Sequence, residues 1–261
     1  MAPVASTSQR IALGAHRLNR IGLGTNRLTD TAKNRSFLEA AVSAGVNFVD
    51  TAHLYTGGES ESTIGATLAP VADDLVVATK GGYHPGGGPE GLRAELEQSF
   101  ERLRVETIAL YYLHRVDPET PLEQTLAVLK EYRDAGRIEH VGISEVSVEQ
   151  IERARSVVPI AAVQNEYSLS ERKHDDVVDF CAREGIVFVP FYPLAGDDPN
   201  LREVAERYRA SPQQIMLAWL LKRSPAILPI PGTLSIEHLK ANLAAREMEL
   251  ADSDFETLTR I

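Results

Sequence analysis

The sequence contains a single cysteine, Cys181, among its 261 residues. One cysteine excludes an internal disulfide, and a chain so poor in cysteine is typical of the reducing cytoplasm. We therefore expect a cytoplasmic protein. Cys181 lies at a core position of a segment with helical periodicity, so packing is its expected role.

Long apolar runs and an excess of positive charge are also missing. No apolar stretch approaches the ~18–20 residues of a membrane span, and the first residues lack the charged-then-apolar order of a signal peptide. Lys and Arg number 27 against 37 Asp and Glu, which gives a net charge of −10. An acidic chain is poorly suited to nucleic acid. We expect neither a membrane nor a nucleic-acid partner, and no feature indicates an oligomeric state.

Short apolar runs alternate with segments of helical periodicity along the chain. The apolar runs lie near 21–23, 46–49, 75–78, 108–113, 141–143, 160–163, 186–190 and 227–230. The helical segments lie at 35–44, 60–68, 91–103, 122–134, 148–155, 173–184, 211–222 and 236–244. Strict alternation implies a parallel sheet, and eight such units in about 240 residues match a closed (β/α)8 barrel.

A doubly wound sheet is the competing α/β architecture. It would carry a GxGxxG turn after its first strand, and only Gly22 and Gly24 are present there. We therefore predict an α/β fold of the (β/α)8 TIM barrel type. No linker divides the chain, so residues 1–261 are predicted to form one domain, with 1–8 as a loose tail. Residues 9–18 predict a short antiparallel hairpin that turns at Gly14.

Polar residues with useful chemistry stand at the C-terminal ends of successive predicted strands. In a (β/α)8 barrel these ends share one face, where barrel enzymes keep their active sites. Each residue alone could be a cap or a satisfied core hydrogen bond, but a series of them favours a site. The series comprises Asp50, Lys80, His114, Ser144 with Glu145, and Gln164 with Asn165.

Four of these residues suit acid catalysis at a carbonyl oxygen. Asp50 and Lys80, from adjacent strands, can form a buried ion pair, which on its own could be purely structural. Tyr55 can return over the barrel mouth, where the Lys80 ammonium is expected to lower its phenol pKa from about 10. His114 can bond a carbonyl oxygen or relay protons. No nucleophile is present, and no metal site is expected because no second ligand lies at a suitable spacing.

These residues lie in motifs that resemble the aldo-keto reductases over essentially the whole chain. The motifs are DTAHLY, ATKGG, YYLHRVD, GIS, QNEYS, FYPLA and IPGT. The resemblance implies a barrel whose floor the hairpin closes, in a short-loop, bacterial-type member of the family. It implies NADPH-dependent reduction of a small aldehyde or ketone, or oxidation of the alcohol. Asp50, Tyr55, Lys80 and His114 would be the catalytic tetrad, with Tyr55 protonating the oxygen.

The resemblance also implies a cofactor site. Ser144 and Gln164 match residues that bind the nicotinamide amide, and Phe191 matches the aromatic residue that stacks on the ring. Residues 192–196 match the pyrophosphate segment. The complete implied set is Gly24, Thr25, Asp50, Ser144, Gln164, Phe191, Tyr192, Pro193, Leu194, Gly196, Ile230, Pro231, Gly232, Thr233, Ser235, His238 and Asn242.

Two residues depart from the family pattern. Glu145 replaces the usual Asn after the serine, and a carboxylate cannot copy an amide donor. Gly232 occupies a place where a cation often reads the 2′-phosphate, which leaves His238 and Lys240 nearby. NADPH is the expected cofactor, and NADH remains possible.

Two other functions fit parts of the pattern. One is a regulatory subunit that keeps the barrel and binds cofactor but turns over poorly. The other is a barrel lyase in which Lys80, free of Asp50, forms a Schiff base. Short loops, among them residues 196–201, predict an open pocket whichever function holds. His53, Tyr83, His84 and Arg115 are expected to face it.

Overall fold

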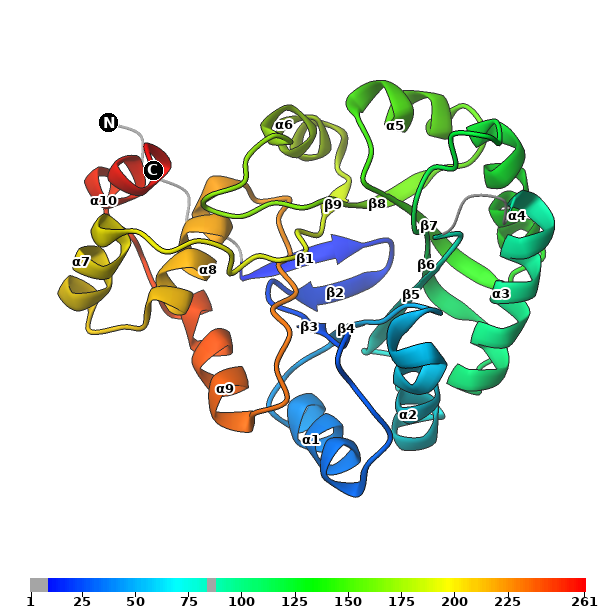
Figure 1. Ribbon diagram of the computed structural model, residues 1–261, viewed down its shortest axis with the longest axis horizontal. Coiled ribbons are helices and arrows are strands. Elements are labelled where there is room, and N and C mark those ends of the chain that lie inside the picture. Colours follow the sequence, from blue (N-terminus) through cyan, green and yellow to red (C-terminus); the bar gives the residue numbers. More distant parts are fainter. Residues whose placement is uncertain (1–8, 84–87) are drawn as a thin grey trace.

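A parallel sheet curled into a barrel forms the centre of the molecule (Figure 1). The computed structural model describes residues 9–83 and 88–261, so the predicted tail 1–8 and His84 lie outside the described residues. Seven parallel strands neighbour one another in chain order, as a βα alternation requires. They are β3 (Leu23–Gly24), β4 (Phe48–Asp50), β5 (Val76–Gly81), β6 (Ile108–Leu113), β7 (Ile138–Ser144), β8 (Ile160–Gln164) and β9 (Val187–Phe188).

The segment 226–232 closes the sheet where an eighth strand, near 227–230, was predicted. On one side Ile227 bridges Phe188 in parallel register. On the other side the Pro229 carbonyl accepts the Gly22 N–H at 3.0 Å. Pro229 and the proline two residues later have no N–H to donate, so the segment cannot form a full ladder. The ring is thus closed by isolated bridges rather than by a regular strand.

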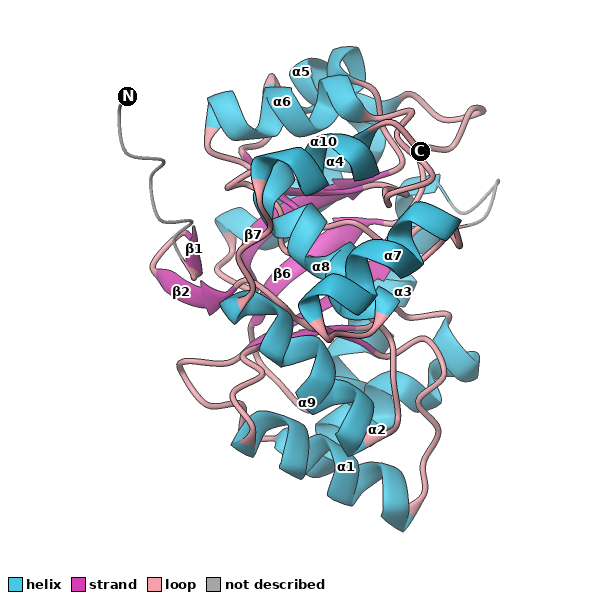
Figure 2. Cartoon of the chain, turned by 90° about the vertical axis from the view of Figure 1, so that its left-hand side faces the viewer, coloured by secondary structure: helices cyan, strands magenta, loops and turns pink. Residues whose placement is uncertain are grey.

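Helices that connect successive strands along the chain surround the outside of the sheet (Figures 1 and 2). The predicted helices are all present within a few residues of their expected bounds. In the described part of the chain they are α1 (Ala32–Ser43), α2 (Glu59–Leu68), α3 (Gly88–Leu103), α4 (Leu122–Asp134), α5 (Val148–Arg155), α6 (Asp175–Glu184), α8 (Pro212–Arg223) and α9 (Ile236–Ala244), with short 3-10 turns η1 (Tyr55–Gly58) and η2 (Ala245–Glu247). Among these described residues, no helix has the length and apolar character needed to cross a membrane.

Two further helices interrupt the predicted strict alternation. α7 (Pro199–Tyr208) precedes α8, and α10 (Asp252–Thr259) ends the chain. The region 196–201 was interpreted as a loop, but α7 begins in it. Asp198 caps α7 by accepting the Asn200 N–H, and proline follows at the first helical position, so the start signal was present.

The N-terminal hairpin closes the floor of the barrel. β1 (Arg10–Leu13) pairs antiparallel with β2 (His16–Asn19), and Figure 2 shows the pair at one end of the sheet. Leu13 and Leu18 are buried in the barrel interior together with Phe48. The prediction of a hairpin-closed (β/α)8 barrel is confirmed.

Arg20, directly after β2, ties this floor to the C-terminal part of the chain. Its side chain is 2% exposed and donates to the Ile227 carbonyl at 3.2 Å and to the Leu221 carbonyl at 3.0 Å. A third bond reaches the carbonyl of Ser224, the residue that caps α8. Burial lowers the pKa of Arg20 to about 10, so the guanidinium remains charged at neutral pH.

Replacing Arg20 should therefore destabilise the closed barrel. In Arg20→Met the carbonyls lose their charged donor while the volume is roughly kept, so we expect a loss of about 3 kcal/mol in the free energy of unfolding. Urea unfolding followed by circular dichroism measures it. The exposed Arg260→Met is the control and should change stability by less than about 0.5 kcal/mol. Equal stabilities of the two variants would contradict this role.

Candidate active site

A pocket of about 700 Å³ opens at the C-terminal ends of the strands, opposite the hairpin. This is the face on which the sequence placed the site. The residues that line it are Gly24, Thr25, Asn26, Arg27, Asp50, Leu54, Tyr55, Tyr83, His114, Arg115, Ser144, Gln164, Phe191, Tyr192, Pro193, Leu194, Ala195, Ile230, Pro231 and Gly232.

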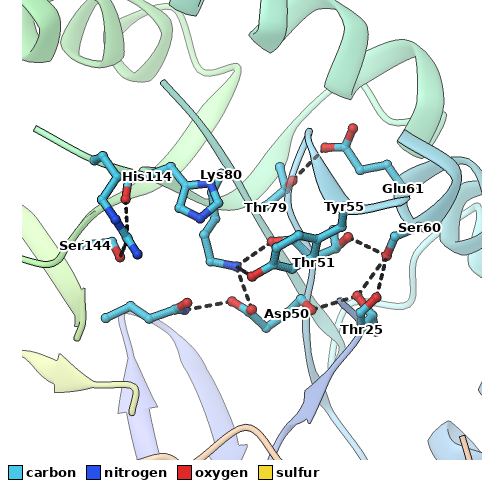
Figure 3. A network of polar contacts seen from close by, with 12 residues as sticks. Thr25, Asp50, Thr51, Tyr55, Ser60, Glu61, Thr79, Lys80, His114 and Ser144 are labelled. Carbon is cyan, nitrogen blue, oxygen red and sulfur yellow. Dashed lines mark hydrogen bonds and ion pairs between the residues drawn. The ribbon is translucent and has the colours of Figure 1, made fainter. Parts of the chain in front are cut away.

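The predicted ion pair lies at the base of this pocket (Figure 3). Asp50 ends β4 and Lys80 lies near the end of β5, and their side chains are 1% and 0% exposed. Lys80 Nζ donates to Asp50 Oδ1 and to the Thr51 carbonyl, both at 2.6 Å. Gln164 Nε2, from the end of β8, donates to Asp50 Oδ2 at 2.9 Å. The pair is therefore fully hydrogen-bonded within the protein.

The two charges hold each other in the ionised form. Burial alone would lower the pKa of Lys80, but the Asp50 carboxylate and Tyr55 together raise it above its usual value. Burial raises the pKa of Asp50, opposed by the Lys80 ammonium and by the Gln164 amide. Lys80 is thus a fixed ammonium and not the free amine that a Schiff-base lyase needs.

Tyr55 lies over the lysine, on the turn that leads into α2. Its hydroxyl is 3.3 Å from Lys80 Nζ, and the ammonium lies 4.8 Å from the ring centroid. The turn passes through left-handed backbone at Thr56, Gly57 and Gly58. Gly58 has a φ of +95°, a backbone conformation that glycine adopts without the steric cost that a side chain would bring. The tight turn returns the tyrosine over the barrel mouth, as predicted.

The pKa of Tyr55 is raised above its usual value, contrary to the prediction. Burial is the largest cause, and it outweighs the Lys80 ammonium, which acts in the opposite direction. The Asp50 carboxylate adds to the increase. The physical reason is that burying the phenolate away from water costs more free energy than the Lys80 ammonium, which is already paired with Asp50, gains by attracting it. Tyr55 therefore keeps its proton at neutral pH.

His114 and Arg115 complete the opposite wall of the pocket. The His114 ring lies edge-on to Tyr55, with centroids 6.1 Å apart, and to Tyr83 at 4.9 Å. Arg115 donates to the His114 carbonyl at 2.8 Å and to Ser144 Oγ at 3.0 Å. Its guanidinium lies 5.5 Å from the Tyr83 ring centroid and 5.6 Å from that of Phe191. The His114 imidazole and the Arg115 guanidinium thus line the pocket beside Tyr55.

A second layer of hydroxyl groups supports the strand ends (Figure 3). Thr25 Oγ1 donates to the Asp50 carbonyl at 2.8 Å and lies 2.9 Å from Ser60 Oγ. Ser60 Oγ in turn lies 2.7 Å from Thr51 Oγ1. The start of α2 is in this way bonded to the ends of β3 and β4. Because these bonds occupy the Thr25 side chain, this residue serves to hold the backbone of Asp50 and the start of α2 in place.

The residues expected to bind the cofactor divide into two groups. Those at the strand ends and in the segments 191–194 and 230–232 line the pocket. The remaining five lie outside its lining, four of them on the approach to α9 and along that helix. These five are Gly196, Thr233, Ser235, His238 and Asn242. Ser235 is the N-cap of α9 and accepts the His238 N–H at 3.3 Å.

Several pocket residues were not predicted. Asn26, Arg27 and Leu54 line the cavity, whereas His53, which was expected to face it, contacts Gln98 instead, with 3.0 Å between His53 Nε2 and Gln98 Oε1. Asn26 and Arg27 follow the end of β3, so the same strand-end argument could have found them. Arg27 donates to the Gly232 carbonyl at 3.3 Å and brings a cation to the place where Gly232 lacks one.

Glu145 turns away from the pocket and is absent from its lining. Its backbone is left-handed, with φ of 53°, a conformation that Asn tolerates better than Glu. The carboxylate accepts the Glu166 N–H at 2.6 Å and lies 3.5 Å from Lys173 Nζ and 3.7 Å from His174 Nε2. Burial alone would raise the pKa of Glu145, but these three partners lower it to about 2.

Comparisons with known proteins agree with this fold and pocket. The model of the Aldo/keto reductase family matches residues 20–197 and 197–261. Pyridoxine 4-dehydrogenase from Escherichia coli is 33% identical over 98% of this chain and 99% of its own length. A thermostable aldo-keto reductase solved with the inhibitor epalrestat is 30% identical, with a TM-score of 0.89 over 96% of this chain and 98% of that one.

A further solved structure is an aldo/keto reductase from Klebsiella pneumoniae in complex with NADP and acetate. It is 26% identical, with a TM-score of 0.85, over 97% of this chain and 94% of that one. The family match and the identity to the Escherichia coli relative, both over nearly the full chain, decide the assignment. The chain belongs to the aldo/keto reductase family of NAD(P)-dependent oxidoreductases.

The Glu145 contacts predict how stability depends on pH. A carboxyl with a pKa depressed to about 2 stabilises the fold above the unfolded value of 4.5, and this contribution is lost as pH falls from 4.5 to 2. Glu145→Gln should lower the free energy of unfolding at pH 7 by about 1.5 kcal/mol, the value of a hydrogen bond to a charge. Urea unfolding at pH 7 and near pH 3 should show the gap to wild type narrowing in acid. A gap that is constant with pH would contradict this role of the charge.

Proposed function

We propose that the protein reduces small aldehydes or ketones to alcohols with NADPH, and that Asp50, Tyr55, Lys80 and His114 form its catalytic group. The observation that carries the proposal is the chain of contacts from Asp50 through Lys80 to the Tyr55 hydroxyl at the base of the pocket. It presents a protonated phenol to the cavity, backed by a fixed ammonium. A carbonyl oxygen that receives a proton there needs such a donor.

Tyr55 is the proposed general acid. Because burial raises its pKa, the phenol retains its proton until a carbonyl oxygen becomes basic during the reaction. The Lys80 ammonium favours the phenolate that forms as the proton leaves. This interaction is stronger in the transition state than in the ground state, so it accelerates the chemical step. Asp50 keeps Lys80 charged and in place, and His114 can bond the carbonyl oxygen.

The pocket has the features that a nicotinamide dinucleotide requires. Ser144 and Phe191 bring a hydroxyl and an aromatic ring to one side of the catalytic group. The lining cations in the described part of the chain, Arg27 and Arg115, stand against a single lining acid, Asp50, which Lys80 neutralises. A locally positive pocket in a chain of net charge −10 suits an anionic cofactor. When bound, the cofactor supplies a hydride to the carbonyl carbon.

Several groups are proposed to hold the phosphates. Residues 192–196 and Gly232 are the proposed pyrophosphate wall, and Arg27 is added to them because it contacts the Gly232 carbonyl. Ser235, His238 and Asn242 lie at the N-terminal end and along α9, where free N–H groups and the helix dipole favour an anion. Arg27, His238 and Lys240 are the cations proposed for a 2′-phosphate. NADPH should therefore be preferred, modestly, over NADH.

The substrate class is small carbonyl compounds or the corresponding alcohols. The Escherichia coli relative is a pyridoxine dehydrogenase, which acts on a small alcohol, and this supports the class without fixing the compound. A regulatory subunit with little turnover is the second candidate. It is favoured only if the protein binds cofactor and turns over no carbonyl or alcohol.

The catalytic acid can be tested with Tyr55→Phe. The ring is kept and only the transferable proton is lost, so kcat should fall by at least 10²–10⁴-fold with little change in cofactor affinity. Tyr132→Phe, on α4, removes a hydroxyl far from the pocket and is the matched control. Reduction of nitrobenzaldehyde is followed by NADPH absorbance, with deuterated cofactor to show that hydride transfer limits the rate. A Tyr55→Phe variant with the wild-type rate under that condition would exclude Tyr55 as the acid.

Cofactor preference can be tested with Arg27→Ala. One exposed phosphate contact is worth about 1 kcal/mol, so the Kd for NADPH should rise roughly fivefold. A smaller effect on NADH would place Arg27 at the 2′-phosphate, and an equal effect would place it at the pyrophosphate. Arg17→Ala, on the hairpin at the other end of the barrel, is the control. Unchanged affinity for both cofactors would remove Arg27 from the site.

A further inference from the structure

Three side chains with metal-ligating atoms meet at the floor of the barrel, away from the pocket. His16 begins β2, and Glu139 and His140 lie near the start of β7. One ligand atom from each residue lies within 4.8 Å of the other two. His16 Nε2 is 2.9 Å from Glu139 Oε2, and the two imidazole centroids are 6.2 Å apart with ring planes at 80°. Within the described residues this is the group whose geometry could hold a metal ion.

The elements that carry these side chains are held in place. β7 is hydrogen-bonded to β6 and to β8, and His140 stands opposite Leu110 in that register. The turn of the hairpin lies directly against the His140 ring. A Cβ on Gly14 would fall 2.3 Å from His140 Nε2, and its φ of +56° also favours glycine. The hairpin and β7 therefore keep a close and defined separation.

We propose that His16, Glu139 and His140 form a binding site for a divalent transition-metal ion such as Zn²⁺. Two imidazoles and one carboxylate form a donor set that Zn²⁺ accepts, with a fourth position left for water. Ligand bonds of about 2.1 Å in a tetrahedral arrangement place the ligand atoms about 3.4 Å apart. Ligand atoms separated by as much as 4.8 Å would thus need to approach by up to about 1.4 Å, whereas the His16 and Glu139 atoms, now 2.9 Å apart, would separate slightly. The Glu139 side chain is 46% exposed, so it has room to move and an ion from solvent can reach it.

The charges around the cluster are mixed. Arg133 contributes a positive charge near His140, which opposes a cation, although it lies 3.8 Å from Asp134. Glu139 supplies the opposite charge within the cluster itself. The alternative explanation of the contacts is an ordinary surface pair of His16 and Glu139. That pair alone does not account for a second imidazole beside it.

A bound ion would join segments more than 120 residues apart in the chain. It would fasten the hairpin to the sheet that the hairpin closes, at the end of the barrel opposite the pocket. The expected role is therefore to stabilise the floor, without a part in hydride or proton transfer. The sequence-based expectation of no metal site considered only how possible ligands are spaced along the chain. It could not detect this cluster, because its residues come together only when the barrel has folded.

The test is titration of the full, tag-free protein with Zn²⁺ by calorimetry, together with the thermal midpoint. One ion should bind per chain, and at 100 times Kd the folding equilibrium should shift about 100-fold toward the native state. This shift should appear as a rise of several degrees in Tm. Co²⁺ in place of Zn²⁺ should give the visible absorption bands of a tetrahedral site.

The variants decide which residues are ligands. His16→Ala and Glu139→Gln should each weaken Zn²⁺ binding at least tenfold, whereas His174→Gln, which removes an imidazole elsewhere, should bind as wild type does. Glu139→Gln is nearly isosteric and the side chain is half exposed, so the Tm of the metal-free variant should equal that of wild type. A loss of Zn²⁺ binding in this variant would then reflect the loss of a ligand rather than damage to the hairpin. Absence of saturable binding to wild type, or equal binding by wild type and Glu139→Gln, would overturn the proposal.

Discussion

The buried ion pair of Asp50 and Lys80 is the constraint on which the site depends. Both side chains are almost completely buried, and either charge alone would cost several kcal/mol at that position. The Thr51 carbonyl and the Gln164 amide supply the remaining hydrogen bonds. Gln164 ends β8 and Asp50 ends β4, strands separated in the sheet by three others. The charges are therefore satisfied only when the sheet has curled far enough for these strand ends to meet.

The same burial shapes the chemistry proposed for Tyr55. It raises the pKa of the phenol, which keeps the proton in place at neutral pH. It also removes the water that would screen Lys80, so the ammonium acts strongly on any charge that develops on the phenol oxygen. A solvated tyrosine beside a solvated lysine would have neither property. The raised pKa is thus compatible with acid catalysis, although it has the opposite sign from the expected shift.

Much of the fold and the centre of the site could be predicted from the sequence. Strands buried on both faces are almost wholly apolar, so a charge at the end of one is conspicuous, and this identified Asp50 and Lys80. The alternation of apolar runs and helical segments predicted the barrel, and the turn at Gly14 predicted the hairpin. These features depend on neighbours along the chain. The helix α7 was also readable from Asp198 and its proline but was interpreted as a loop.

The features that escaped prediction arise between segments distant in sequence. The sign of the Tyr55 pKa shift depends on how deeply other strands bury it, which no local pattern shows. The contact of Arg27 with the Gly232 carbonyl joins the first and last parts of the barrel. The cluster at His16 joins the hairpin to β7 in the same way. Closing a sheet into a ring necessarily brings segments that are distant in sequence together. A barrel therefore creates sites at its seam and its floor that the spacing of residues along the chain cannot reveal.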